Sequence, residues 1–171
     1  APTTTTTALL VLGDALAMVL LDMHGFTKSD YGRRHPGGAI GRMVTMQACD
    51  VMRKVDELAL VSAGSTVRET IYAMSHARSG AAVIVDEQKK LLGIFTDGDF
   101  RRNAAADDLV LTRKVGDFMT VNPVSVKEDS PVVEVIKLVE KRHIDDLVVV
   151  NGNNQVVGLI DIQDLPGLKI M

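Results

Sequence analysis

Residues 93–99 read GIFTDGD, and a related run, GLIDIQD, occupies residues 158–164, which lie 65 positions later. Three more landmarks recur at the same or nearly the same offset: VIV at 83–85 with VVV at 148–150, STV at 65–67 with SPV at 130–132, and DVM at 50–52 with DFM at 117–119. The offset is 65 in every pair except the last, where it is 67. A near-constant offset with one two-residue slip indicates a duplicated unit.

Each copy predicts the element order β-α-β-β-α. Val67, Ile71 and Met74 recur at helical spacing in the first copy, and we expect Ser65 and Ser130 to cap the two helices, with Pro131 in the first turn. Apolar runs predict the strands, and polar turns at 86–90 and 151–155 separate them. The predicted strands are 81–85 and 92–95 in the first copy and 147–150 and 156–160 in the second. A short helix then begins near Asp97 or Asp161. One such unit has little core of its own, so we expect two of them to pack sheet to sheet.

Composition limits the function classes. Charged residues make up 24% of the 171-residue chain, the formal net charge is −3, and aromatic residues are only 4%. A mildly acidic chain without a basic stripe argues against a nucleic-acid partner. The single cysteine, Cys49, cannot form an internal disulfide, which fits a cytoplasmic setting. The histidines have no ligand spacing, and we expect no metal site.

The duplicated order and the motif at 93–99 resemble a tandem CBS-domain pair over about residues 48–165. The resemblance implies an α/β (α+β) fold with CBS domains at 48–112 and 113–171. It also implies a regulatory nucleotide such as AMP or ATP, with no cofactor required. The pair would form a homodimer through its aliphatic helices, at 65–75 and 130–141.

The strand-to-helix junction at 96–99 is the candidate nucleotide site. A helix N-terminus suits a phosphate, the Thr96 hydroxyl would add a donor, and the Asp99 carboxylate would accept from ribose hydroxyls. By the same resemblance the base would meet the backbone at the start of the preceding strand. The full set of candidate residues is Gly80, Ala81, Thr96, Asp97, Gly98, Asp99, Arg101 and Arg102. The alternative interpretation is purely structural: Thr96 as a helix cap and the aspartates as first-turn acids.

The second copy departs from this pattern. Asp161 stands where the first copy has Thr96, and Asp145 and Asp146 stand where it has Gly80 and Ala81. Carboxylates repel a phosphate, so we expect nucleotide at the Thr96/Asp99 site and not at the Asp161/Asp164 site.

The N-terminal segment carries a second resemblance. An apolar run at 8–21 predicts a buried helix of a soluble protein rather than a membrane span, preceded by capping threonines at 3–7. The runs LGDALA at 12–17 and HPGGAIGR at 35–42 resemble the end of a sugar-isomerase (SIS) domain, which we place at 1–47. A SIS domain joined to a CBS pair is similar to the D-arabinose 5-phosphate isomerase family.

That resemblance implies a tetrameric parent enzyme that interconverts arabinose 5-phosphate and ribulose 5-phosphate for lipopolysaccharide (Kdo) synthesis. His35 would be its acid/base residue, because the reaction needs a group that titrates near neutral pH. The Ser/Gly phosphate loop of such enzymes is not in this chain, so we expect the 171 residues alone to be inactive. The nucleotide sugar CMP-Kdo is a further candidate effector. Two alternatives remain: a free-standing adenine-nucleotide-binding CBS protein, or a dimerisation module that binds nothing.

Overall fold

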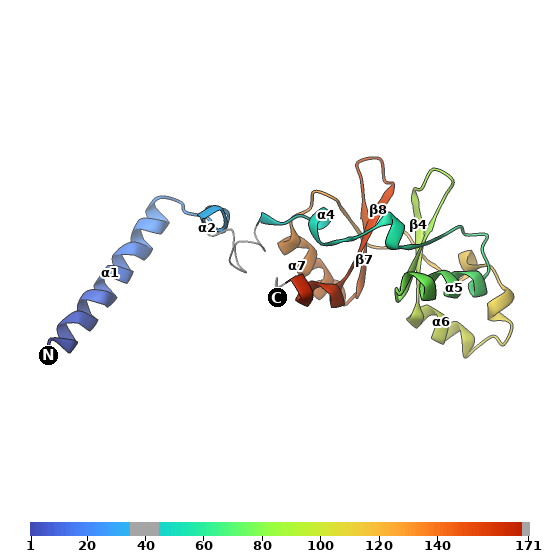
Figure 1. Ribbon diagram of the computed structural model, residues 1–171, viewed down its shortest axis with the longest axis horizontal. Coiled ribbons are helices and arrows are strands. Elements are labelled where there is room, and N and C mark those ends of the chain that lie inside the picture. The colour runs from blue at the N-terminus through green and yellow to red at the C-terminus, as the bar shows by residue number, and fades with distance from the viewer. Residues whose placement is uncertain (35–44, 169–171) are drawn as a thin grey trace. The chain divides into compact units, whose positions relative to one another are not determined.

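The computed structural model describes residues 1–34 and 45–168 and divides the chain into two units, Ala1–Thr45 and Met46–Met171 (Figure 1). The first unit contains the helices α1 (Thr3–Met23) and α2 (Lys28–Arg34). His35, the predicted acid/base residue, lies outside the described residues.

Helix α1 corrects two expectations. It begins at Thr3, because the threonine tract is helical: the hydroxyls of Thr6 and Thr7 donate to the carbonyl of Thr3 instead of capping the helix. None of its residues is buried within the part of the chain that the structure describes, where we expected a buried helix. With 21 residues and a mean hydropathy of 1.8, α1 is long and apolar enough to cross a membrane, a test that core helices of soluble proteins and signal sequences also pass.

The second unit contains both sequence copies. Its helices are α4 (Ala48–Val51), α5 (Val67–Ala77), α6 (Asp97–Ala104) and α7 (Val132–Arg142). Its strands are β1 (Arg53–Lys54), β2 (Ala59–Val61), β3 (Ala81–Val85), β4 (Leu91–Thr96), β5 (Thr120–Val121), β6 (Ser125–Lys127), β7 (Asp146–Val150) and β8 (Val156–Asp161). Short 3-10 helices complete it at Val55–Glu57, Val110–Thr112, Val115–Asp117 and Ile162–Leu168.

Both copies have the predicted order β-α-β-β, and each builds one four-stranded sheet. In each sheet a short first strand pairs in parallel with the strand after the helix, and that strand pairs antiparallel with its successor. Both central pairs carry a register shift at the corresponding place, between Ile84 and Val85 and between Val149 and Val150. The predicted duplication and the mixed α/β fold are therefore confirmed.

The two copies exchange their first segments. Strand β1 precedes the first copy's sheet in sequence but pairs with β8 in the second sheet, whereas β5 pairs with β4 in the first sheet. Backbone hydrogen bonds fix the exchange reciprocally: Ala48 N donates to Ser130 O over 2.8 Å, and Val115 N donates to Ser65 O over 2.8 Å. The sequence did not lead us to predict this exchange.

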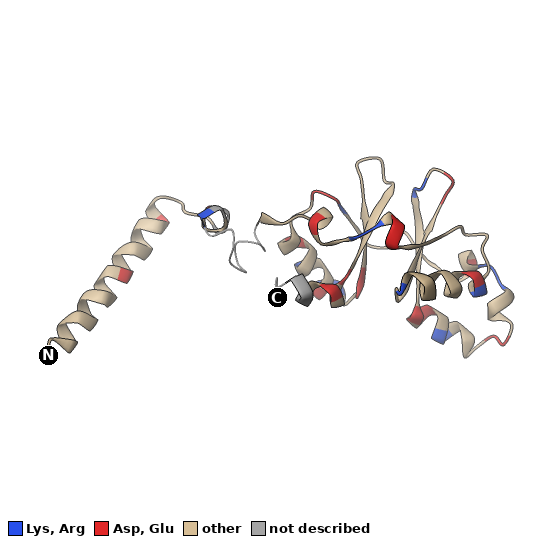
Figure 2. Ribbon diagram, viewed as in Figure 1, with Lys and Arg blue, Asp and Glu red and all other residues tan. Residues whose placement is uncertain are grey.

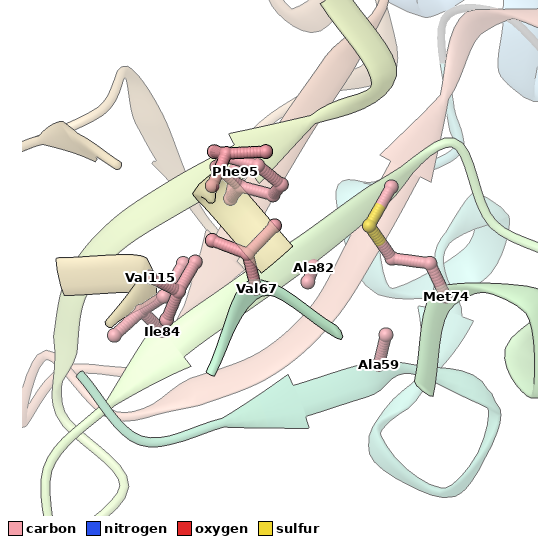
Figure 3. Close-up of a cluster of buried hydrophobic side chains, with 8 residues drawn as sticks. Ala59, Val67, Met74, Ala82, Ile84, Phe95 and Val115 are labelled. Atoms are coloured by element: carbon pink, nitrogen blue, oxygen red, sulfur yellow. The ribbon is translucent and has the colours of Figure 1, made fainter. Parts of the chain in front are cut away.

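Two apolar clusters stand out among the residues that the structure describes in this unit. One lies between the first sheet and α5, where Val67, Ile84, Phe95 and Val115 are fully buried. Figure 3 shows these side chains converging from the helix, the sheet and the segment at 115. The other cluster joins the two sheets and includes Val83 of the first and Val148 of the second. The predicted packing of sheet against sheet is therefore confirmed.

Two local predictions were wrong. The residues at the N-cap positions are Thr66 and Pro131 instead of Ser65 and Ser130. Thr66 forms a capping box with Glu69, a stronger arrangement than a lone serine because two backbone N–H groups gain partners. The last helix of the second copy is a 3-10 helix, Ile162–Leu168, and the Pro-Gly pair in that sequence disfavours a continued α-helix.

The glycines of the repeated Gly-Ile and Gly-Leu motifs make room for the exchanged strands. A Cβ added to Gly93 would lie 2.5 Å from Met119 Sδ, and one added to Gly158 would lie 2.7 Å from the carbonyl oxygen of Arg53. Each glycine lies in the sheet of one copy, and it is crossed by the exchanged strand of the other copy, β1 or β5, and by the methionine just before that strand. In each copy the repeated glycine thus packs against the methionine of the other copy's Asp-x-Met landmark.

We expect Gly158→Ala to lower the free energy of unfolding by ~1–3 kcal/mol, because the added methyl overlaps the backbone of β1. Urea unfolding followed by circular dichroism measures the change. The matched control is Gly152→Ala, where a Cβ meets nothing within 4 Å and the effect should stay within ~0.5 kcal/mol. Equal effects of the two substitutions would contradict this account of the exchanged strand.

Candidate functional site

A cleft of about 960 Å³ lies in the second unit, where the ends of β4 and β8 meet the starts of the helices that follow them. Both copies line it. From the first copy come Gly80, Thr96, Asp97, Gly98, Asp99, Arg101 and Arg102, and from the second Asp145, Asp146, Asp161 and Asp164. Seven of the eight predicted nucleotide-site residues therefore lie together, and so do the corresponding positions of the second copy.

The first half of the cleft is organised by a capping box at the start of α6. The Thr96 hydroxyl and the Thr96 N–H both donate to Asp99 Oδ2 over 2.9 Å, and Asp99 N donates to Thr96 Oγ1 over 3.3 Å. Asp99 is only 8% exposed. The cap that the structural interpretation predicts at Thr96 is therefore present, and it leaves one carboxylate oxygen of Asp99 outside it.

That second oxygen, Oδ1, accepts a hydrogen bond of 2.5 Å from Arg102. The Arg102 side chain is 71% exposed, so its guanidinium can leave the carboxylate at small cost. Figure 2 shows the acidic first turn of α6 and the basic residues that follow it. A Cβ at Gly98 would come within 3.3 Å of the Arg102 guanidinium, so glycine keeps the space beside this side chain open.

The start of β3 forms the adjoining wall. Asp97 N donates to the carbonyl oxygen of Gly80 over 2.9 Å, which joins this wall to α6. A Cβ at Gly80 would meet only Asp97 Oδ2, at 3.9 Å, so the position is open to a flat group. Ala81 is different: its side chain is buried between the sheets and does not line the cleft. Its carbonyl oxygen accepts from the Ser79 hydroxyl over 2.9 Å, and its N–H donates to the same oxygen over 3.3 Å.

The second half of the cleft contains a cation that we did not predict. Arg53, on β1, donates to both carboxylate oxygens of Asp164, from Nε over 2.6 Å and from Nη2 over 3.0 Å. Its Nη2 also lies 3.5 Å from Asp161, and its Nη1 donates to the carbonyl oxygen of Arg78 over 3.1 Å. The hydrogen bond to Asp164, together with the attraction of the neighbouring carboxylates, raises the pKa of Arg53 above its ordinary value.

Asp146 is a half-buried member of this acidic group. Burial raises the pKa of its carboxyl to about 6, and repulsion from Asp161 and Asp145 acts in the same direction. Its strand partner in the register of β7 and β8 is Asp161. The positive charge of Arg53 lowers the pKa of Asp146 and so opposes this shift, but the hydrogen bonds of Arg53 go to Asp164. The expected repulsion of a phosphate from this half therefore stays a prediction. The charge of this half now includes the cation of Arg53 as well as the carboxylates.

The cleft residues that we missed follow the same repeat. Arg78 and His143 are 65 positions apart, both end their helices in a left-handed conformation, and both line the cleft. Arg53 and Thr120 are 67 positions apart and lie on the exchanged strands. The two offsets are the signal that could have found them. Among residues 1–34 and 45–168, no group of three or more His, Cys, Asp or Glu side chains is placed to hold a metal ion.

Comparison with protein families matches the CBS domain twice, over residues 48–106 and 115–165. Curated relatives include the arabinose 5-phosphate isomerase KdsD of Pseudomonas aeruginosa, 41% identical over 173 residues. The enzyme of the same name from Yersinia pestis is 38% identical over 165 residues. These alignments cover 100% and 96% of this chain but 52% and 50% of the relatives, so the chain spans about half the length of the proteins it matches.

Solved structures share the fold. The CBS domain pair of protein MJ0100, in complex with 5'-methylthioadenosine and S-adenosylmethionine, superposes with a TM-score of 0.64 at 26% identity, covering 72% of this chain and 94% of that one. A CBS domain protein from Pyrobaculum aerophilum complexed with AMP gives a TM-score of 0.63 at 24% identity, covering 70% of this chain and 90% of that one.

The raised pKa of Asp146 predicts a pH-dependent stability. The folded state binds this proton more tightly than the unfolded chain, whose carboxyl titrates near 3.8, so the contribution is fully present below that pH and is lost as the pH rises through about 6. We expect Asp146→Asn to increase the free energy of unfolding by ~1–2 kcal/mol at pH 7 and by almost nothing at pH 4. Urea unfolding at both pH values measures this difference.

The control for the pH series is Asp108→Asn, which removes an exposed carboxylate that does not line the cleft. It should change stability by less than ~0.5 kcal/mol at either pH. A gain for Asp146→Asn that is larger at pH 4 than at pH 7, or equal at both, would show that the carboxyl of Asp146 is not the group responsible.

Proposed function

This chain belongs to the CBS domain family, and from that premise we propose that residues 46–168 form a nucleotide-sensing module of an arabinose 5-phosphate isomerase. The first half of the cleft is the proposed binding site, with an adenine nucleotide such as AMP as the ligand. The observation that carries the proposal is the position of Thr96 and Asp99 at the start of α6, inside a cleft that also holds Gly80, Arg101 and Arg102.

The chemistry of this half suits a phosphate and a ribose. The first turn of α6 offers the positive end of the helix dipole and the backbone N–H of Gly98, since those of Asp97 and Asp99 already donate to Gly80 O and Thr96 Oγ1. Arg101 and Arg102 supply cationic side chains along the same wall. Asp99 accepts hydrogen bonds through Oδ2 within the cap, so Oδ1 is the oxygen available to a ribose once Arg102 turns towards the phosphate. The nucleotide would thus break the exposed ion pair between Asp99 and Arg102. In its place the ribose would contact Asp99 and the phosphate would contact Arg102.

The base would lie against the start of β3. Gly80 presents no side chain there, and the backbone of Ala81 forms the adjoining edge. Solved relatives of the same fold contain AMP and adenosine-based ligands in CBS pairs, which supports an adenine nucleotide over the alternative of a module that binds nothing. CMP-Kdo has the same phosphate and ribose groups and stays a second candidate ligand for the titration.

The isomerase assignment rests on the relatives. They align with nearly the whole of this chain, the first 45 residues included, whereas a free-standing CBS protein would have no reason to contain that segment. In this proposal His35 is the acid/base residue of the isomerase, and the sugar phosphate is a substrate of the parent enzyme only. Dimerisation of two CBS pairs through α5 and α7 and a tetrameric parent also stay predictions.

We expect calorimetry to detect AMP binding to the chain and Asp99→Asn to weaken it by ~10–100-fold, because a hydrogen bond to a charged acceptor contributes ~1.5–3 kcal/mol. The matched control is Glu69→Gln. Glu69 closes the same kind of capping box on α5 but lies outside the cleft, so its variant loses a cap and should keep the affinity. Loss of binding in Asp164→Ala with retention in Asp99→Ala would assign the nucleotide to the other half.

A separate experiment addresses the isomerase. The 171-residue chain alone should not convert arabinose 5-phosphate, whereas the protein encoded by the whole gene should. In that protein His35→Gln is expected to lower turnover by ~10²–10⁴-fold, the range for a general acid or base, with AMP affinity unchanged. His24→Gln serves as the control. Full activity of the His35 variant would reject this residue as the acid/base group.

A further inference from the structure

We infer that Arg53 is a built-in occupant of the second half of the cleft and determines that each CBS pair binds one nucleotide, in the first half. The inference rests on the proposed nucleotide-sensing function. It adds a residue that the sequence motif does not contain and gives it a role in specificity. The contacts of Arg53, the repeat equivalence of the two halves and the exchange of strands lead to it independently.

The repeat makes the two halves comparable position by position. Gly80 corresponds to Asp145, Thr96 to Asp161 and Asp99 to Asp164, each 65 residues apart. All of them line the same cleft. Asp164 is therefore the second copy's counterpart of the proposed ribose acceptor, and the question is what it binds in the folded chain.

Asp164 is bound by Arg53 at both oxygens. The planar guanidinium donates from Nε and Nη2 in a bidentate pair, a geometry that is specific as well as strong. Its remaining nitrogen, Nη1, donates to the backbone of Arg78, and the Arg53 side chain is only 23% exposed. Every nitrogen of this side chain thus has a partner, so the guanidinium is held where a ribose would need to approach Asp164.

The corresponding acid of the first half is bound differently. Asp99 meets Arg102 through one oxygen only, and Arg102 comes from the same short helix and is mostly solvent-exposed. The first residue of β5, the counterpart strand of β1, is Thr120, the repeat equivalent of Arg53. It brings a short neutral side chain to the first half. The exchange of strands therefore places a cation in one half and leaves the other without one from that direction.

The negative charge of the second half disfavours a nucleotide there in addition to the pairing of Arg53 with Asp164. A phosphate there would meet the carboxylate of Asp161 where the first half offers the Thr96 hydroxyl, and Asp145 where the first half has Gly80. Arg53 already offsets part of the charge of Asp161, because its Nη2 lies 3.5 Å from that carboxylate while the guanidinium is paired with Asp164. Removing the carboxylates alone should consequently not open a second site, because the guanidinium would still hold the ribose acceptor.

The test rewrites the second half with the residues of the first. One variant carries Asp145→Gly, Asp146→Ala and Asp161→Thr and keeps Arg53; the other adds Arg53→Thr, the residue at the equivalent position 120. Calorimetric titration with AMP should give one site per chain for the wild type and for the first variant. The second variant should give two sites, with dissociation constants within about tenfold of each other, and circular dichroism confirms that each variant is folded.

Two AMP sites in the wild type, or in the variant that keeps Arg53, would overturn the role of Arg53. A single site in the folded variant with Arg53→Thr would overturn it as well. Both outcomes would leave the proposed function intact. A single conservative change, Asp164→Asn in the wild type, gives a second measure that does not depend on the rewritten half. It should leave AMP affinity within threefold, and a loss of tenfold or more would place the nucleotide on Asp164. Absence of AMP binding from every form would overturn the proposed function and the inference with it.

Discussion

The reciprocal exchange of β1 and β5 is the constraint on which the second unit depends. Each strand is only two residues long, but each completes the sheet of the other copy and brings a preceding methionine across a glycine of that sheet. The hydrogen bonds from Ala48 to Ser130 and from Val115 to Ser65 close both ends of the exchange. Because the sheets also share an apolar cluster, neither copy has a complete core without the other.

The same exchange makes the cleft asymmetric. A duplicated unit with two-fold pairing would present two equal half-sites, yet the strand entering one half carries Arg53 and the strand entering the other carries Thr120. The acids of the second half and this arginine compensate one another, whereas the first half combines a hydroxyl, a single cap-bound carboxylate and exposed arginines. The two halves of the cleft therefore have equivalent backbones but different charges and hydrogen-bonding groups, and a few side chains make the difference.

Local patterns were enough to predict what each copy does by itself. The strands at 81–85 and 92–95, the helix after residue 66 and the junction at Thr96 follow from alternation, helical spacing and capping chemistry within a few residues. The contact between Arg53 and Asp164 joins residues 111 positions apart, and no local pattern contains it. Sequence order assigns Arg53 to the first copy, and only the pairing of β1 with β8 moves it to the second half. The length of α1 was missed because a threonine tract reads as a cap although it continues the helix.

The exchange also has a cost during synthesis. Strand β1 is made long before β8, and at ~5–20 residues per second the ribosome needs roughly 5–20 s to supply the partner that lies about a hundred residues further on. Until then β1 has no partner strand, and the growing chain exposes unpaired backbone at an apolar surface. Contacts so distant in sequence slow folding. The nascent chain is consequently exposed to aggregation or chaperone binding until β8 has been made.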